Sequence, residues 1–268
     1  MRKLITRLKT RNMKTEFFNL KRMQSLFRRQ WALSAKSWRI AMIGSVGINL
    51  AISMLILFAG SNPEAALQSL KTSLFITFLI TGMVFTSLAF KELQEPTTSV
   101  SFLTLPASNF EKYLTGWLFT FPSYSIVSYI LYQMSYLFIS LLAFAAYGTS
   151  PALVSIPWNE LGIIFMVLFI VHSVFFLGGV WFKKMAFFKT LLVLFVISMV
   201  HNFWVFIWAR LLMPISDLSE KEFVISGVPI SNADELSHTA IWVLKSFLIL
   251  ISIMCLITAY FKLKEREG

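Results

Sequence analysis

Six apolar runs alternate with polar segments along the chain. They lie at residues 40–59, 72–90, 114–147, 161–182, 190–211 and 239–261. A helix needs roughly 20 apolar residues to cross a hydrocarbon core of about 30 Å, and each run is close to that length or longer. The pattern therefore predicts an all-α polytopic membrane protein with six transmembrane helices.

The third run, 114–147, is longer than one crossing requires. It would extend about 50 Å if all of it were helical. Pro122 lies near its start, and proline bends helices because it removes a backbone donor. We expect this helix to bend near Pro122, to tilt, or to begin in the cytoplasm.

Small and polar residues recur every four positions in the first run, which places them on one face of a helix. They are Ala41, Ser45, Asn49 and Ser53. Such a ridge suits close association with a neighbouring helix in a membrane.

Composition agrees with the apolar pattern. Hydrophobic residues make up 57% of the 268 residues, and 27 are phenylalanine. The single cysteine, Cys255, falls inside the sixth run, which excludes an intrachain disulfide framework.

The net charge of +11 is distributed unevenly. Twenty of the 24 Lys and Arg residues lie on one predicted side, in residues 1–39, the segments after the second and fourth runs, and the tail. By the positive-inside rule both termini are cytoplasmic. We therefore expect a multi-pass protein of the plasma membrane, the inner membrane of a bacterium, with lipid rather than nucleic acid as the partner of these charges.

The segment before the first run divides in two. Residues 1–15 are basic and we expect a disordered tail. Residues 16–38 predict an amphipathic interface helix with one apolar face, formed by Leu20, Met23, Phe27 and Trp31. Basic residues on its flanks would meet anionic headgroups at the inner membrane surface, or would act as a generic basic anchor. Residues 39–268 then form the six-helix transmembrane domain.

The segment between the second and third runs breaks the membrane pattern. Ser108 and Glu111 fit a capping box, which predicts a helix starting at residue 109. Pro106 disfavours helix at Leu105, and Phe102 and Leu105 are apolar residues placed outside the membrane. These side chains either fold back onto the membrane surface or the N-terminal helix, or dock onto a cytoplasmic protein.

This topology, together with "FKELQEPTTSVSFLTLPASNFEKYLTGWL" at residues 90–118, resembles the permease subunit of the type-2 ABC-transporter family. The resemblance implies that the loop is a coupling helix on a separate cytoplasmic ATPase, which binds the ATP and Mg²⁺. Phe102, Leu105 and Pro106 would form the docking surface, and Ser108 and Glu111 would hold the helix start. It also implies a homodimer, or a heterodimer with a second permease, and export. Glu111 departs from many relatives, so the polarity of the docking contact stays open.

The sequence lacks the common motifs for phosphate binding and metal-dependent catalysis. The chain has no GxxxxGK[ST] phosphate loop, no HExxH and no Cys/His metal-ligand spacing. We expect a non-enzymatic subunit with no cofactor or metal site of its own. No acidic residue falls inside a predicted span, which argues against an ion-driven transporter.

Polar residues inside the spans are the remaining candidates. His172 and His201 fall at similar predicted depth and could form a catalytic pair, make interhelical hydrogen bonds or line a cavity. A second group of polar residues lies in the third and fifth runs: Tyr132, Tyr136, His201 and Asn202. These residues could line a path between subunits, or they could take part in ordinary packing of the helix bundle.

Together these features predict the permease subunit of an ATP-driven exporter of an amphiphilic or lipid-like substrate. The alternative is a non-transport membrane scaffold or assembly factor that recruits another cytoplasmic partner. A third alternative is a membrane enzyme acting on lipid, which would use His172, His201 and the external loop expected at 212–238.

Overall fold

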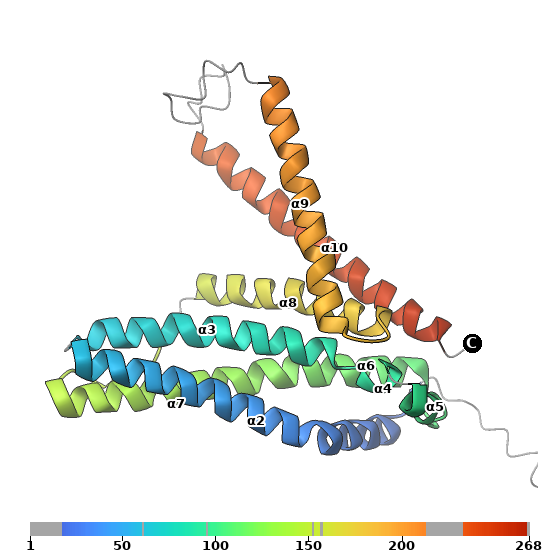
Figure 1. Cartoon of the computed structure of the whole chain (residues 1–268), viewed down its shortest axis with the longest axis horizontal. Coiled ribbons are helices and arrows are strands. Elements are labelled where there is room, and N and C mark those ends of the chain that lie inside the picture. The colour runs from blue at the N-terminus through green and yellow to red at the C-terminus, as the bar shows by residue number, and fades with distance from the viewer. Residues whose placement is uncertain are drawn as a thin grey trace, which may run out of the picture.

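A computed structural model describes residues 18–60, 62–94, 96–151, 153–155, 158–212 and 233–266, and every regular element in these ranges is a helix (Figure 1). Among the described residues, six helical stretches are long and apolar enough to cross a membrane. The fold therefore confirms an all-α protein with the expected number of candidate spans. The predicted tail at 1–15 lies outside the described residues.

The first helix, α2 (Leu20–Gly60), is continuous over 41 residues, about 60 Å. The expected boundary between an interface helix and the first span, at residues 38 and 39, is absent. No proline falls within α2, and Trp38 at the expected boundary is buried in the core. The segment 16–38 and the first span therefore share one helix from Leu20 onward, and the location of its N-terminal part at a membrane surface stays a prediction.

The second helix, α3 (Pro63–Ser87), begins nine residues before the expected start at 72. Asn62 caps it by accepting a hydrogen bond from the backbone of Ala65, and Pro63 occupies the first turn. This helix packs along α2, where the predicted polar ridge lies. Asn49 donates to the Thr77 hydroxyl at 3.2 Å, so the ridge forms an interhelical contact.

Two short helices, α4 (Lys91–Gln94) and α5 (Pro96–Leu103), follow α3. The third span is then divided into α6 (Asn109–Thr120) and α7 (Pro122–Tyr147). The break falls at Phe121, immediately before Pro122, which confirms the expected bend. The span ends where Gly148 adopts a left-handed backbone conformation, with φ of 71°.

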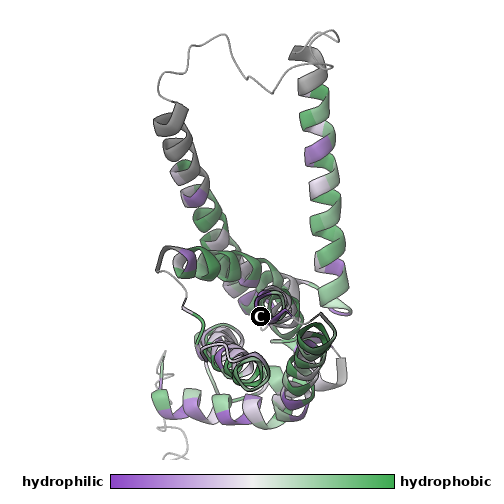
Figure 2. Ribbon diagram, turned by 90° about the vertical axis from the view of Figure 1, so that its left-hand side faces the viewer, coloured by the Kyte–Doolittle hydropathy of each residue, from purple (hydrophilic) through white to green (hydrophobic). Residues whose placement is uncertain are grey.

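The last three helices are α8 (Trp158–Trp181), α9 (Ala186–Leu212) and α10 (Ala233–Glu265). Helix α8 lies alongside α3 and packs against α10, whereas most of α9 and the first part of α10 diverge from the bundle and from each other (Figures 1 and 2). Most of the loop expected at 212–238 lies outside the described residues.

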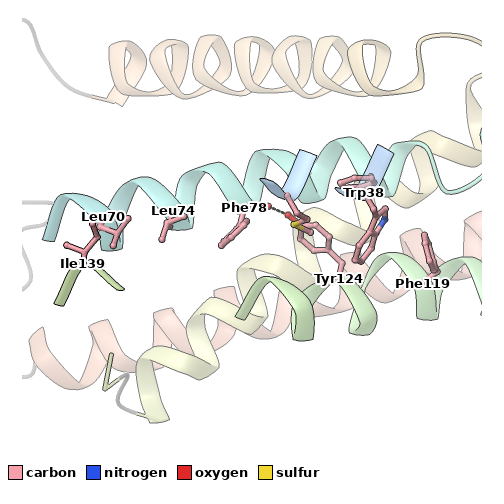
Figure 3. Packing of buried hydrophobic residues seen from close by; sticks show 9 residues of the cluster. Trp38, Leu70, Leu74, Phe78, Phe119, Tyr124 and Ile139 are labelled. Carbon is pink, nitrogen blue, oxygen red and sulfur yellow. Dashed lines mark hydrogen bonds between the residues drawn. The ribbon is translucent and has the colours of Figure 1, made fainter. Parts of the chain in front are cut away.

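The main core lies between α2, α3, α6 and α7. Trp38 contacts the rings of Phe85, Phe119 and Tyr124, with centroids 5.3–5.8 Å apart. The Tyr124 hydroxyl donates to the carbonyl of Phe78 at 2.6 Å (Figure 3). Aromatic rings thus fill the space between the helices, and a hydrogen bond satisfies the buried phenol.

One end of the molecule gathers the start of α2, helices α4 and α5, the start of α6, the α8–α9 turn and the end of α10 (Figure 1). We call it the basic end, because it carries Lys91, Lys112, Lys183, Lys184 and Lys262. The start of α2 and the end of α10 therefore lie on the same side of the bundle. Their location on the cytoplasmic side of a membrane stays a prediction.

Candidate functional site at the basic end

The start of α6 is held by the predicted capping box. The Ser108 hydroxyl accepts from the Glu111 backbone at 3.2 Å, and the Glu111 carboxylate accepts from the Ser108 backbone at 2.9 Å. The S-x-x-E pattern is sufficient to produce this exchange, because all its partners lie within one turn. The prediction of a capped helix starting at residue 109 is confirmed.

Glu111 also connects α6 to the start of α2. Its side chain is fully buried, and Oε1 accepts from the backbone of Asn19 at 2.5 Å and pairs with Arg22 at 3.1 Å. A buried carboxylate is stable when it is both paired and hydrogen-bonded, as this one is. The sequence pattern did not reveal this link, because Asn19 lies 92 residues away.

A second ion pair connects α2 to α4. Arg29 donates through both terminal nitrogens to the Glu92 carboxylate, at 2.7 and 2.5 Å. Gln30, the next residue, donates to the carbonyl of Ala89 at 3.3 Å. The planar guanidinium matches a carboxylate in a fixed geometry, so this pair aligns the two helices as well as attracting them.

Lys112 is buried although it follows the capping residue. Its Nζ donates to the carbonyl of Leu103 at 3.0 Å and lies 5.5 Å from the centroid of the Phe102 ring. A cation at this position satisfies the end of α5 and interacts with a π face. Lys112 therefore joins α5 to α6 and is not a free surface charge.

Phe102 faces the interior, with 7% of its surface exposed. It packs in a cluster with residues from the turn after α3 and from α4, α8 and α10, including Phe90, Leu93, Phe176, Val180 and Leu263. Leu105 is half-buried against this cluster, and Pro106 is exposed. Of the three residues expected to form a docking surface, Pro106 alone is well exposed, and Phe102 supports the segment from within.

The exposed face of α5 and the following turn consists of other residues. Val100 is 63% exposed, and Ser101 and Thr104 are also exposed. We call Val100, Ser101, Thr104 and Pro106 the α5 face. Sequence reasoning missed Val100, because the choice between Val100 and Phe102 depends on which side of α5 the distant helices α8 and α10 cover.

The end of α10 closes the site. Arg266 donates to the carbonyl of Trp181 at 3.0 Å and to that of Leu93 at 3.4 Å. Partial burial lowers the pKa of its guanidinium from the usual value. The Tyr113 hydroxyl donates to the carbonyl of Leu256 at 3.0 Å. The segment from α4 to α6 is thereby joined to α8 and α10 as well as to α2.

The predicted apolar face of the N-terminal segment is partly exposed and partly packed against α6. Leu20 and Trp31 are exposed, whereas Met23 and Phe27 are half-buried. The rings of Phe27 and Trp31 contact Phe119 of α6, with centroids 5.7 and 6.2 Å apart. This part of α2 therefore packs beside the segment from α4 to α6.

The four residues expected to line a path are not brought together within one chain. Tyr132 and Tyr136 are half-buried on α7, whereas His201 and Asn202 are exposed on α9. His172 is buried, and its Nε2 lies 3.0 Å from the Thr120 hydroxyl. The interhelical hydrogen bond expected of His172 is present, but His172 and His201 form no pair in this chain.

The described residues contain no group of three His, Cys, Asp or Glu side chains that could hold a metal ion. No protein-family model matches the chain, and no curated protein or solved structure was found to match it.

Proposed function

We propose that this protein is the membrane-spanning permease subunit of an ATP-driven transporter. A separate cytoplasmic ATPase, which binds ATP and Mg²⁺, would dock at the basic end. The observation that supports the proposal is that the segment from α4 to α6 has one side attached to other helices and one side exposed. Its inner side is tied to α2, α8 and α10 by ion pairs, hydrogen bonds and aromatic packing, while the α5 face is free to contact a partner.

This arrangement suits the transmission of force. A partner that displaces α5 would move Phe102 within its cluster and pull on α2 through Glu111 and Glu92. Packed interiors move as units because they have few voids to absorb a displacement. ATP-driven movement of a docked ATPase would therefore be transmitted directly to four of the candidate spans, which contain α2, α6, α8 and α10.

A second permease chain would complete the membrane domain. Residues 191–206 of α9 are all exposed, including the polar His201 and Asn202. Within the described residues, Asn202 bonds back to Ser198 of its own helix at 2.7 Å. Polar side chains in spans usually face protein, because they are costly in lipid. We propose that a second copy covers α9, with a different permease as the alternative that crosslinking would reveal.

We propose export of an amphiphilic or lipid-like substrate across the plasma membrane, because the spans are aromatic and weakly polar. A scaffold that recruits another cytoplasmic partner through the same α5 face would be the alternative. The two proposals differ in the identity of the protein bound there.

The test is purification of the tagged protein in mild detergent, followed by identification of co-purifying chains. We expect a nucleotide-binding ATPase with the wild type and its loss from the double variant Val100→Asp, Thr104→Asp. Both side chains are exposed, so the variant keeps the internal contacts of the segment.

Met185→Asp is the matched control. Met185 is 65% exposed in the α8–α9 turn, at the same end of the molecule but outside the α5 face. The control should retain the ATPase. Recovery of a partner that binds no nucleotide, lost in the same double variant, would favour the scaffold. Equal ATPase recovery from all three proteins would contradict docking through the α5 face.

A further inference from the structure

A cavity of about 280 Å³ lies between α3, α7 and α8, away from the basic end. Apolar side chains form most of its wall, among them Phe75, Leu79, Ile164 and Leu168. The volume is at the lower limit of small-molecule sites, which range from about 300 to 1,000 Å³. We call this cavity the α3–α8 groove.

The dimensions of the groove match one leaflet of a membrane. Its α3 wall runs from Gln68 to Leu79, which is about 16 Å by helical rise. Half of a hydrocarbon core of about 30 Å is about 15 Å. The groove is therefore as long as the acyl region of a single leaflet.

Charges of both signs lie at one end of the groove. Lys71 and Glu160 line it from opposite walls, and each directly precedes an apolar run, at 72–90 and 161–182. Among the described residues, neither side chain has an ion-pair partner. A cation and an anion that line one groove, at the edge of the apolar region, match a ligand with a phosphate and an ammonium group.

The loop before α8 is anchored beside this end of the groove. The Gln133 amide of α7 donates to the Val154 carbonyl and accepts from the Val154 backbone nitrogen, both at 3.1 Å. The two hydrogen bonds attach the loop before α8 to α7.

Polar groups also lie deeper in the groove. Ser128 of α7 lines it, but its hydroxyl is buried beside Tyr124 and does not open into the groove. The Tyr129 and Tyr132 rings lie on the same wall.

We propose that the α3–α8 groove binds one zwitterionic phospholipid from the leaflet opposite the basic end. The phosphate lies at Lys71, the ammonium lies at Glu160, and an acyl chain follows the apolar wall towards Leu79. This site does not depend on transport or on an ATPase, so ATPase recovery and lipid binding succeed or fail separately.

The test uses protein in vesicles of equimolar phosphatidylethanolamine and phosphatidylglycerol, with a trace of phosphatidylethanolamine that carries a photoreactive acyl chain. We expect labelled peptides concentrated on α3, α7 and α8. Leu79→Trp fills the groove and should lower this labelling about tenfold, which corresponds to the loss of roughly two methylenes of contact. Ile76→Trp is the matched control, because Ile76 is 50% exposed on the same helix and does not line the groove.

A second pair of variants, on another helix, keeps the proposal testable if Leu79→Trp fails to fold. Leu168→Trp fills the groove from α8, and Ile163→Trp is its control on the exposed side of that helix. Labelling spread over all lipid-facing helices, or lowered equally in the filling and control variants, would overturn the proposal by showing bulk lipid contact only.

Headgroup selectivity is tested with the charged pair. The same vesicles, with a matched photoreactive phosphatidylglycerol, should show several-fold weaker groove labelling in the wild type. Glu160→Gln should remove that preference, because Lys71 then attracts either phosphate. The double variant Lys71→Glu, Glu160→Lys keeps one charge of each sign and should retain the preference for phosphatidylethanolamine. Equal labelling by both lipids in the wild type would overturn a zwitterion-specific site.

Discussion

At the residue scale, Glu111 combines a local and a distant role. Its cap on α6 follows from Ser108 three residues earlier, whereas its pairing with Arg22 requires the start of α2 to reach it. The carboxylate is fully buried, so its partners cannot be replaced easily by water. The residue should therefore matter more for stability than its place in a polar loop indicates.

Glu111→Gln tests this role. The amide keeps the shape but loses the charge and leaves part of the site unsatisfied, so we expect a loss of about 1–3 kcal/mol in the free energy of unfolding. Thermal unfolding followed by tryptophan fluorescence in detergent measures it. Glu92→Gln is the control, because the partly exposed Arg29–Glu92 pair should contribute about 1 kcal/mol or less. Equal losses in the two variants would contradict a special role for Glu111.

Sequence reasoning succeeded at this scale where the partners are neighbours in the chain. The capping box of Ser108 and Glu111 is an example. It did not distinguish Phe102, which is buried, from Val100, which is exposed, because part of the cover over α5 comes from side chains of α8 and α10 that are more than 70 residues away.

At the scale of elements, helix ends follow local signals. Asn62 with Pro63 starts α3, Pro122 divides the third span, and Gly148 ends it. Helix α2 contains no such signal between the expected interface helix and the first span, and it continues without a break. Amphipathic and fully apolar segments can therefore share one helix when nothing in the chain separates them.

The α8–α9 contact depends on the absence of a side chain at Gly178. A Cβ there would collide with the Thr190 hydroxyl, which donates to the carbonyl of Ala186 at 2.8 Å. We expect Gly178→Ala to cost about 1–3 kcal/mol in the free energy of unfolding through overpacking. Thermal unfolding in detergent measures the change.

The matched control is Gly162→Ala on the same helix, where a Cβ would meet open space. It should not destabilise the protein, because alanine favours helix over glycine. Thr190→Ala removes the colliding hydroxyl, so the double variant Gly178→Ala, Thr190→Ala should regain part of the loss. A double variant less stable than Gly178→Ala would show that the collision is not the cause.

At the scale of the whole molecule, the proposed second copy concerns α9. The helices α2, α3, α7 and α8 pack against one another, whereas α9 carries exposed polar residues away from them (Figure 2). A second chain at α9 would bury these groups and extend the membrane domain.

Cysteine crosslinking tests whether a second copy covers α9. In a Cys255→Ala background, Val200→Cys should form a disulfide-linked dimer on mild oxidation in membranes, because Val200 is 63% exposed on α9. Ile130→Cys is the control, since Ile130 is 51% exposed on α7, outside the proposed interface. Gel mobility with and without reductant reads the result. A product containing another chain, or equal dimer formation in both variants, would contradict the homodimer.

The sequence by itself determined the number of spans, the capped start of α6, the bend before Pro122 and the gathering of basic residues at one end. These features depend on hydrophobic length, on residues within one helical turn and on charge, all of which are read along the chain. The tertiary structure alone decided that Phe102 is buried, that Glu111 meets Arg22 and that Lys71 and Glu160 line one groove. Each depends on helices far apart in the sequence packing at a particular angle, which no local pattern encodes.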